Sequence, residues 1–87
     1  MKYSKEYIEM GNIGSYNESA FHGLKVYHID EKEYKIRFMW FYDGEPNGRM
    51  TTANINCTAA GRPYFITRGH RIHLDKIVRE YGVGSWI

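Results

Sequence analysis

Residues 33–42, EYKIRFMWFY, are the stretch from which the fold of this chain is predicted. Their apolar side chains first alternate with charged ones, and from Phe38 onward the apolar side chains occupy odd and even positions alike. Successive side chains of a strand point to opposite faces, so this stretch predicts the central strand of a sheet. One face carries an apolar row made of Tyr34, Ile36, Phe38, Trp40 and Tyr42. The other face begins with charges and ends with Met39 and Phe41, so at this end it is either covered by another element or offered to a partner.

Strand partners are predicted on both sides of this stretch. Residues 24–29 read as a strand, and the polar residues 30–32 turn the chain into residues 33–42, which gives a β-hairpin. The DGEPNG sequence at residues 43–48 combines several turn signals and reverses the chain into a third strand over residues 49–58. In that strand we expect the core face to carry Thr51, Ala53, Ile55 and Cys57, and the solvent face to carry Met50, Thr52, Asn54 and Asn56.

The last third of the chain predicts a second hairpin followed by a helix. Residues 64–67 and 70–74 flank an Arg-Gly turn at residues 68–69. Asp75 is placed to cap a helix over residues 75–81, which Gly82 would end. The apolar stripe of this helix would consist of Leu74, Ile77, Val78 and Tyr81.

Shorter helical segments are predicted near the N-terminus. Residues 4–10 allow about two helical turns. Ser15 and Glu18 have the spacing of a capping box, which predicts a short helix over residues 16–22 that ends at Gly23. The expected fold is therefore α+β: an antiparallel sheet of four to five strands, with short N-terminal helical turns and a C-terminal helix on one face.

Composition limits the class of protein. A chain of 87 residues predicts a single domain over residues 1–87 with one hydrophobic core. Aromatic residues make up 16% of the chain, which is more than so small a core requires, so some must lie at the surface. Surface aromatics suit interfaces, and tyrosines also favour a solvated sheet, so both explanations stay open. We expect a cytoplasmic protein that does not engage a membrane, because the sequence shows neither an apolar run of spanning length nor a signal peptide.

Positive charge is concentrated in the C-terminal third. Residues 61–87 contain five Lys or Arg against two Asp or Glu, a net charge of +3, although the whole chain carries only +2. The basic cluster consists of Arg62, Arg68, His70, Arg71, His73, Lys76 and Arg79. Such a cluster could contact phosphates or an acidic protein surface, or it could be a solvated hairpin face.

Catalysis and metal binding are not expected. His70 and His73 are three residues apart, which on a strand places them on opposite faces. Cys57 is the single cysteine, so no internal disulfide can form, and it reads as a small buried apolar residue rather than a nucleophile. The glycines follow no phosphate-loop pattern. We therefore predict a protein without enzymatic activity, metal or cofactor.

The C-terminal run PYFITRGHRIHLDKIVREYG, residues 63–82, resembles the ending of some small accessory proteins of tailed phages. In those proteins a YF-x-x-x-G-x-R hairpin leads into an L-D-x-I/F helix. The resemblance implies a short protein without enzymatic activity, of a class in which many members bind and block a host enzyme or a defence complex. It implies a host-takeover or anti-defence role and transfers no site residues.

The leading hypothesis is a small non-enzymatic binding protein, an inhibitor or adaptor, that engages a macromolecular partner such as a host protein or complex. Its contacts would be the basic cluster together with Met39 and Phe41. The alternative is an RNA- or DNA-binding module in which sheet aromatics stack on bases and the hairpin arginines contact the backbone. Self-association through exposed strand edges also stays open.

Overall fold

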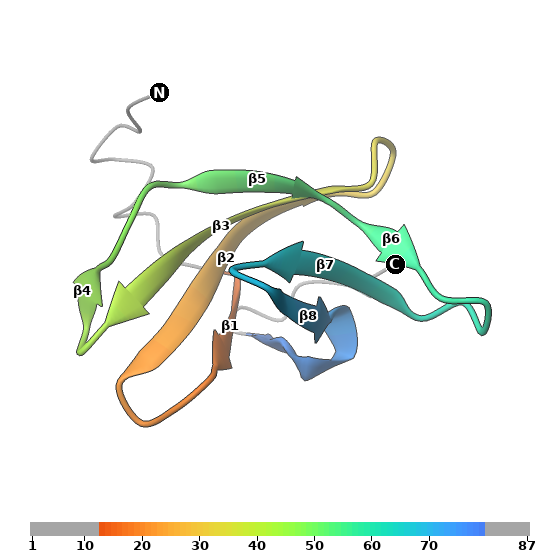
Figure 1. The fold of residues 1–87 in the computed structure, drawn as a ribbon. Helices are drawn as coiled ribbons and strands as arrows, with labels where there is room; N and C mark the ends of the chain where they lie inside the picture. The colour runs from red at the N-terminus through yellow and green to blue at the C-terminus, as the bar shows by residue number, and fades with distance from the viewer. Residues whose placement is uncertain (1–12, 80–87) are drawn as a thin grey trace.

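The computed structural model describes residues 13–79, and nearly all of its secondary structure is antiparallel sheet (Figure 1). The first sheet contains β1 (Gly14–Asn17), β2 (His22–Asp30), β3 (Lys35–Tyr42), β4 (Glu45–Pro46), β5 (Thr51–Asn54) and β9 (Val78–Arg79). The second sheet contains β6 (Asn56–Cys57), β7 (Pro63–Thr67) and β8 (His70–His73). Among the described residues the one helical segment is the 3-10 helix η1 (Leu74–Lys76).

The two sheets share one bent segment of chain. The first sheet has the order β4-β3-β2-β1-β9, and β5 also pairs with β3, at the opposite end of that strand from β4. The second sheet has the order β6-β7-β8. Only Ile55 separates β5 from β6, so the chain passes from one sheet to the other at a bend, as strands at the corners of packed sheets do.

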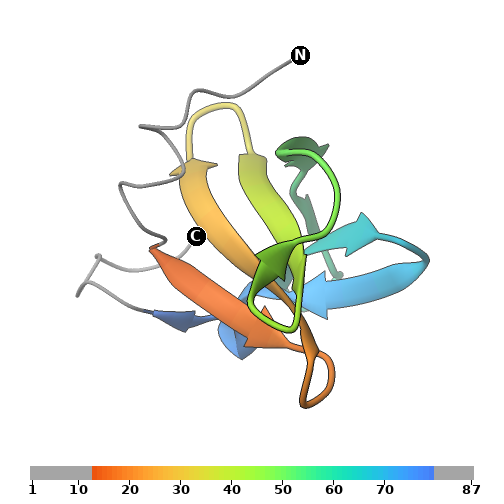
Figure 2. The same ribbon diagram turned by 90° about the vertical axis from the view of Figure 1, so that its left-hand side faces the viewer.

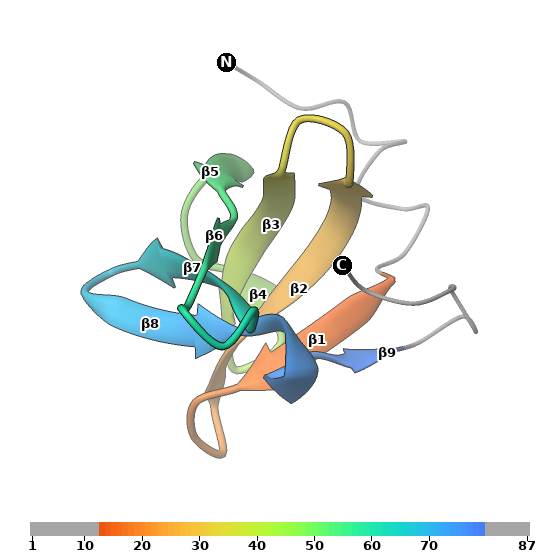
Figure 3. The same ribbon diagram turned by 90° about the vertical axis from the view of Figure 1, so that its right-hand side faces the viewer.

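The core lies between the two sheets and is built on the predicted apolar row of β3. Ile36, Phe38 and Trp40 are at most 4% exposed, which confirms the central strand. Figures 1 and 3 show the β7–β8 hairpin crossing over the first sheet. Phe38 of the first sheet meets Phe65 of β7 with ring centroids 5.0 Å apart. The remaining members of the core are Leu24, Val26, Ile55, Ile72, Leu74 and Ile77.

Both predicted hairpins are confirmed. In the β2–β3 turn, Asp30 Oδ1 accepts hydrogen bonds from the backbone amides of Lys32 and Glu33, each at 3.0 Å. These bonds, chiefly the one from Glu33, hold the pKa of Asp30 below its ordinary value. The β7–β8 turn consists of Arg68 and Gly69 at φ values of 50° and 76°. Positive φ at both central residues gives the turn a twist that matches the flanking strands.

The predicted third strand over residues 49–58 is wrong in its continuity. It is broken at Ile55 into β5 and β6, and the sequence analysis did not predict β4. Because the bend changes the sheet, a single alternation of faces does not hold along it. Beyond the bend Cys57 is exposed, the reverse of the prediction, whereas Ile55 and Ala53 pack on the core as expected. The prediction is also reversed before the bend, where Met50 is only 4% exposed and Thr51 is exposed.

The predicted C-terminal helix over residues 75–81 is wrong for the residues that the structure describes. The chain makes one 3-10 turn, closed by the hydrogen bond from Ile77 N to Leu74 O at 3.1 Å, and then extends into β9. Leu74 and Ile77 are buried because one such turn already aligns residues three apart. Val78 is 65% exposed and pairs with Ser15 of β1. Tyr81 lies outside the described residues.

The predicted helix over residues 16–22 is also wrong. Ser15 belongs to β1 and pairs with Lys25, so it does not form the capping box. The backbone amides of Glu18 and Ser19 donate to His22 O, at 2.9 and 3.0 Å, and these bonds close a turn into β2. The helical turns predicted at residues 4–10 fall outside the described part of the chain. The fold is thus an antiparallel β fold and not the α+β fold that the sequence analysis predicted.

Within residues 13–79 no helix is long and apolar enough to span a bilayer.

Candidate binding surface

Aromatic and basic side chains from three separate segments meet at one end of the molecule. We call this group the aromatic end. It consists of Phe21, His22, Trp40, Tyr42, Arg68 and His70. Figure 2 looks toward this end of the fold, with β4 and the β1–β2 loop on the side of the viewer.

The ring contacts in the aromatic end form one continuous chain. The centroids of Phe21 and Tyr42 are 6.5 Å apart, and those of Tyr42 and His22 are 4.9 Å apart. His22 lies 6.2 Å from Trp40, which in turn lies 6.4 Å from His70. The amide of Asp43 donates to Phe21 O at 2.7 Å and fixes the β1–β2 loop against the end of β3.

Exposure differs sharply along this chain of rings. Trp40 is 4% exposed, and its Nε1 donates to Thr67 Oγ1 at 2.9 Å, so it anchors β3 to the β7–β8 hairpin. Phe21 is 61% exposed and Tyr42 is 53% exposed. The chain of contacts therefore leads from a buried anchor to two large aromatic side chains in solvent.

Arg68 is held over Trp40 by neutral groups. Its guanidinium carbon lies 4.9 Å from the centre of the Trp40 ring, and its Nη2 donates to Asn47 O at 2.7 Å. The amide of Asn47 donates to Trp40 O at 2.8 Å, which places that carbonyl beside the hairpin turn. A Cβ on Gly48 would lie 3.2 Å from Nη2, so a glycine leaves the room that the guanidinium occupies.

His70 joins the hairpin turn to the β1–β2 loop. Its Nε2 lies 3.1 Å from Oε1 of Glu18. His22 reaches toward the β4–β5 segment, where its Nε2 is 3.3 Å from Nδ2 of Asn47. Three connecting segments are thus tied together around Trp40, and the surface they form is pre-organised.

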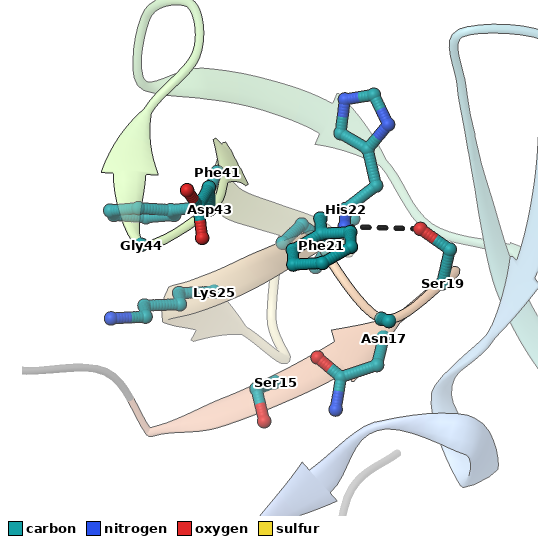
Figure 4. A pocket seen from close by; sticks show the side chains of 12 residues that line it. Ser15, Asn17, Ser19, Phe21, His22, Lys25, Phe41, Asp43 and Gly44 are labelled. Atoms are coloured by element: carbon teal, nitrogen blue, oxygen red, sulfur yellow. Dashed lines mark hydrogen bonds between the residues drawn. The ribbon is translucent and has the colours of Figure 1, made fainter.

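A hollow of about 480 Å³ adjoins the aromatic end on the outer face of β1, β2 and β3 (Figure 4). Gly23 lines this hollow, and a Cβ there would lie 2.7 Å from Tyr16 O. Phe21 and Phe41 line the hollow together with Lys25, whose Nζ lies 4.4 Å above the Phe41 ring. The predicted contact Phe41 is therefore half-buried beside a lysine, and the other predicted contact on this face, Met39, is 3% exposed.

The predicted basic cluster does not form one patch. Arg62 donates to Asp75 Oδ2 from Nη2 at 2.8 Å, and this contact holds the pKa of Asp75 below its ordinary value. Arg71 lies on the outer face of the β7–β8 hairpin, with its guanidinium carbon 4.3 Å from the centre of the Tyr64 ring. His73 shares that face, with its ring 5.5 Å from the same tyrosine.

The other members of the predicted cluster are dispersed. Arg68 and His70 belong to the aromatic end. Lys76 is exposed in η1. The side chain of Arg79 lies outside the described part of the structure.

The two exposed aromatics of this surface, Phe21 and Tyr42, were not predicted to be exposed. Tyr42 was assigned to the core row, and Phe21 was placed in a helix that does not form. A usable signal was present at Tyr42, because the Asp-Gly pair that follows it ends the strand and leaves its last side chain at the rim. For Phe21 no local signal exists, since its position depends on the length of the β1–β2 loop.

The described residues show no arrangement for metal chemistry. In residues 13–79 no three His, Cys, Asp or Glu side chains gather closely enough to hold a metal ion. Cys57 is an exposed free thiol in β6.

No protein-family model, curated protein or solved structure matches this chain. The functional proposal therefore rests on the geometry above.

Proposed function

We propose that this chain is a small non-enzymatic binding protein, an inhibitor or adaptor, whose aromatic end contacts a protein partner. The observation that carries the proposal is the continuous chain of ring contacts that presents Phe21 and Tyr42 to solvent beside Arg68. Large aromatic side chains and arginine contribute most of the binding energy in many protein interfaces. Because the surface is already tied to Trp40, little ordering is needed on binding.

Charge pairing favours a protein over a nucleic acid as the partner. Two members of the predicted basic cluster, Arg62 and His70, face carboxylates inside the chain. Asp43 is exposed directly after Tyr42, so a negative charge adjoins the exposed rings. A phosphate backbone needs a more continuous positive surface than this mixture supplies.

Apart from Tyr42 at the end of β3, three aromatics of the sheets have a ring that is buried or covered on one face. Trp40 is buried, the Phe41 ring lies beneath the ammonium group of Lys25, and the Tyr64 ring lies beneath the guanidinium group of Arg71. Stacking requires an accessible ring face. The resemblance to phage accessory proteins implies an inhibitor that acts on a host or defence protein, and of its two elements residues 13–79 contain the hairpin but not the helix.

The test is an affinity pull-down from a bacterial lysate with and without nuclease, using parent protein and two variants. Tyr42→Ala removes one exposed ring from the aromatic end. Tyr34→Ala is the matched control, because Tyr34 lies just before the other end of β3 and is 46% exposed against 53% for Tyr42. We expect a nuclease-resistant protein partner whose recovery falls about tenfold or more in Tyr42→Ala and stays at the parental level in Tyr34→Ala.

Equal recovery with both variants would reject the aromatic end as the contact. Loss of the captured material on nuclease treatment would instead assign the chain to the RNA- or DNA-binding class.

A further inference from the structure

We infer that Arg68 is the receptor for a carboxylate on the protein partner; this inference rests on the proposed function and specifies the chemistry of its ligand. Arg68 is exposed, and within residues 13–79 it faces no carboxylate at ion-pair distance. Its contacts are a carbonyl oxygen and an aromatic ring, both neutral. The guanidinium is thus fixed in place, and no carboxylate of residues 13–79 pairs with its charge.

The unused donors of Arg68 suit a planar oxyanion. Nη2 gives one of its two hydrogens to Asn47 O at 2.7 Å. Its second hydrogen remains to form a fork with the neighbouring Nε or Nη1, which have no protein acceptor in the described part of the chain. An arginine presents its donors in a rigid fork that matches a carboxylate. Since the side chain of Arg68 is already held against Trp40, it loses little further conformational entropy when it binds a carboxylate.

The backbone supports a role for the side chain of Arg68. It occupies the first central position of the β7–β8 turn at φ 50°, where Asn, Asp or Gly is preferred. Left-handed backbone at an ordinary L-residue is unfavourable. A residue type that does not suit the turn therefore stands at the position where its guanidinium reaches the aromatic end.

The charges around Arg68 favour a carboxylate of a protein segment over a chain of phosphates. Glu18 is held by His70, and Asp43 and Glu45 are exposed near the end of β3. These acids would repel a polyanion along its length. A protein segment can place one carboxylate on Arg68 and keep apolar or basic groups beside the acids.

The experiment uses two probes, a short peptide whose single glutamate is flanked by leucine and lysine residues and a dT decamer, each titrated into the labelled full chain at low salt. The readouts are the NMR signals of Arg68 Nε–H and Trp40 Nε1–H. Arg68→Asn removes the guanidinium and introduces a residue that tolerates the left-handed turn, so the hairpin is expected to fold. Arg71→Gln is the matched control, because it removes an equal charge from an arginine that also lies over a ring without a carboxylate partner within the described residues.

We expect the glutamate peptide to shift both signals, to bind more tightly than the dT decamer, and to lose about tenfold in affinity in Arg68→Asn but little in Arg71→Gln. Equal losses in the two variants, tighter binding of the dT decamer, or no binding of the peptide would each overturn the inference. If the captured partner of the pull-down needs Tyr42 but binds Arg68→Asn as tightly as the parent, the proposed function stands and the carboxylate receptor is rejected.

Discussion

Asp75 fits the sequence pattern of a helix cap, but its side chain instead contacts Arg62, thirteen residues earlier in the chain. Its position after a hairpin predicted a helix cap, but His73 occupies the residue before η1 and makes no side-chain cap bond. Asp75 instead accepts hydrogen bonds from Arg62 Nη2 and Nε at 2.8 and 3.3 Å. The contact joins the segment before β7 to the turn after β8, so it closes the base of that hairpin.

The Arg62–Asp75 pair predicts a defined pH dependence of stability. The hydrogen bond and charge of Arg62 lower the pKa of Asp75 from its ordinary value of 3.8, so the folded state favours the ionised carboxylate. The resulting stabilisation is present above that value and is lost as the pH falls through the lowered pKa. We expect Asp75→Asn to melt at a lower temperature than the parent at pH 7, with the difference shrinking below about pH 4.

Thermal melts monitored by circular dichroism over pH 2 to 7 measure this difference. For Arg62→Gln the difference in melting temperature from the parent should shrink at low pH in the same way, because this variant removes the other partner of the same contact. A difference in melting temperature that persists undiminished at pH 2 would contradict the assignment. The pair is half-exposed, so the effect should also weaken in high salt.

At the scale of elements, sequence reasoning succeeded where the determining signals are local. The β2–β3 hairpin follows from an alternating strand on each side of a polar turn, and the β7–β8 hairpin follows from an Arg-Gly turn between two short strands. The predicted helix over residues 75–81 failed because the spacing of Leu74 and Ile77 fits one 3-10 turn as well as a longer helix. What decides between them is the pairing of β9 with β1, and β1 lies near the other end of the chain.

Close approach of β1 and β2 gives a test at this scale. A Cβ on Gly23 would lie 2.7 Å from Tyr16 O and 3.3 Å from Asn17 Cα, and both are backbone atoms that cannot move aside cheaply. We expect Gly23→Ala to destabilise the protein by about 1–3 kcal/mol, the range found for overpacked sites. Urea unfolding measures the loss.

The place in the structure where stability is lost distinguishes the close contact between the added Cβ and β1 from the general consequence of replacing a glycine. Hydrogen exchange in Gly23→Ala should accelerate first at the amides that pair β1 with β2. Gly61→Ala is the comparison, since it adds a Cβ with no atom within 4 Å and only the strain of φ +84°. Accelerated β1–β2 exchange in Gly61→Ala as well would show that the close contact is not the cause.

In the molecule as a whole, the two sheets enclose one core, and the chain connects them at the bend at Ile55 and again through η1, which leads from β8 to β9. The sequence predicted the apolar row of β3 but not the second sheet that covers it, because that sheet begins only where the chain bends at Ile55. The aromatic end was not predictable as a unit for a similar reason. Its members come from three segments that meet only after the β7–β8 hairpin has crossed the first sheet.

Packing between the sheets is tested by a double-mutant cycle on Phe38 and Phe65. Both side chains are 0% exposed, and their rings are 5.0 Å apart in a tilted arrangement. Aromatic pairs of this kind contribute about 0.5–1.5 kcal/mol beyond the area they bury. We expect Phe38→Leu and Phe65→Leu to show a coupling energy of that size in urea unfolding.

A control cycle pairs Phe65→Leu with Val78→Ala at an exposed site in β9, and there the two effects should add. A coupling energy of zero between Phe38 and Phe65 would mean that the two sheets do not meet through these rings.

The pairing of β1 with β9 has a consequence for the chain as it leaves the ribosome. The β2–β3 and β7–β8 hairpins join neighbouring segments, so each can form soon after it has been synthesised. Among the described residues the edge of β1 that faces β9 has no other strand partner, so within that part of the chain it stays unpaired until Val78 and Arg79 have emerged. Through most of translation the nascent chain therefore exposes a strand edge that could pair with a second nascent copy, and completing the last strand of the first sheet is what closes that edge.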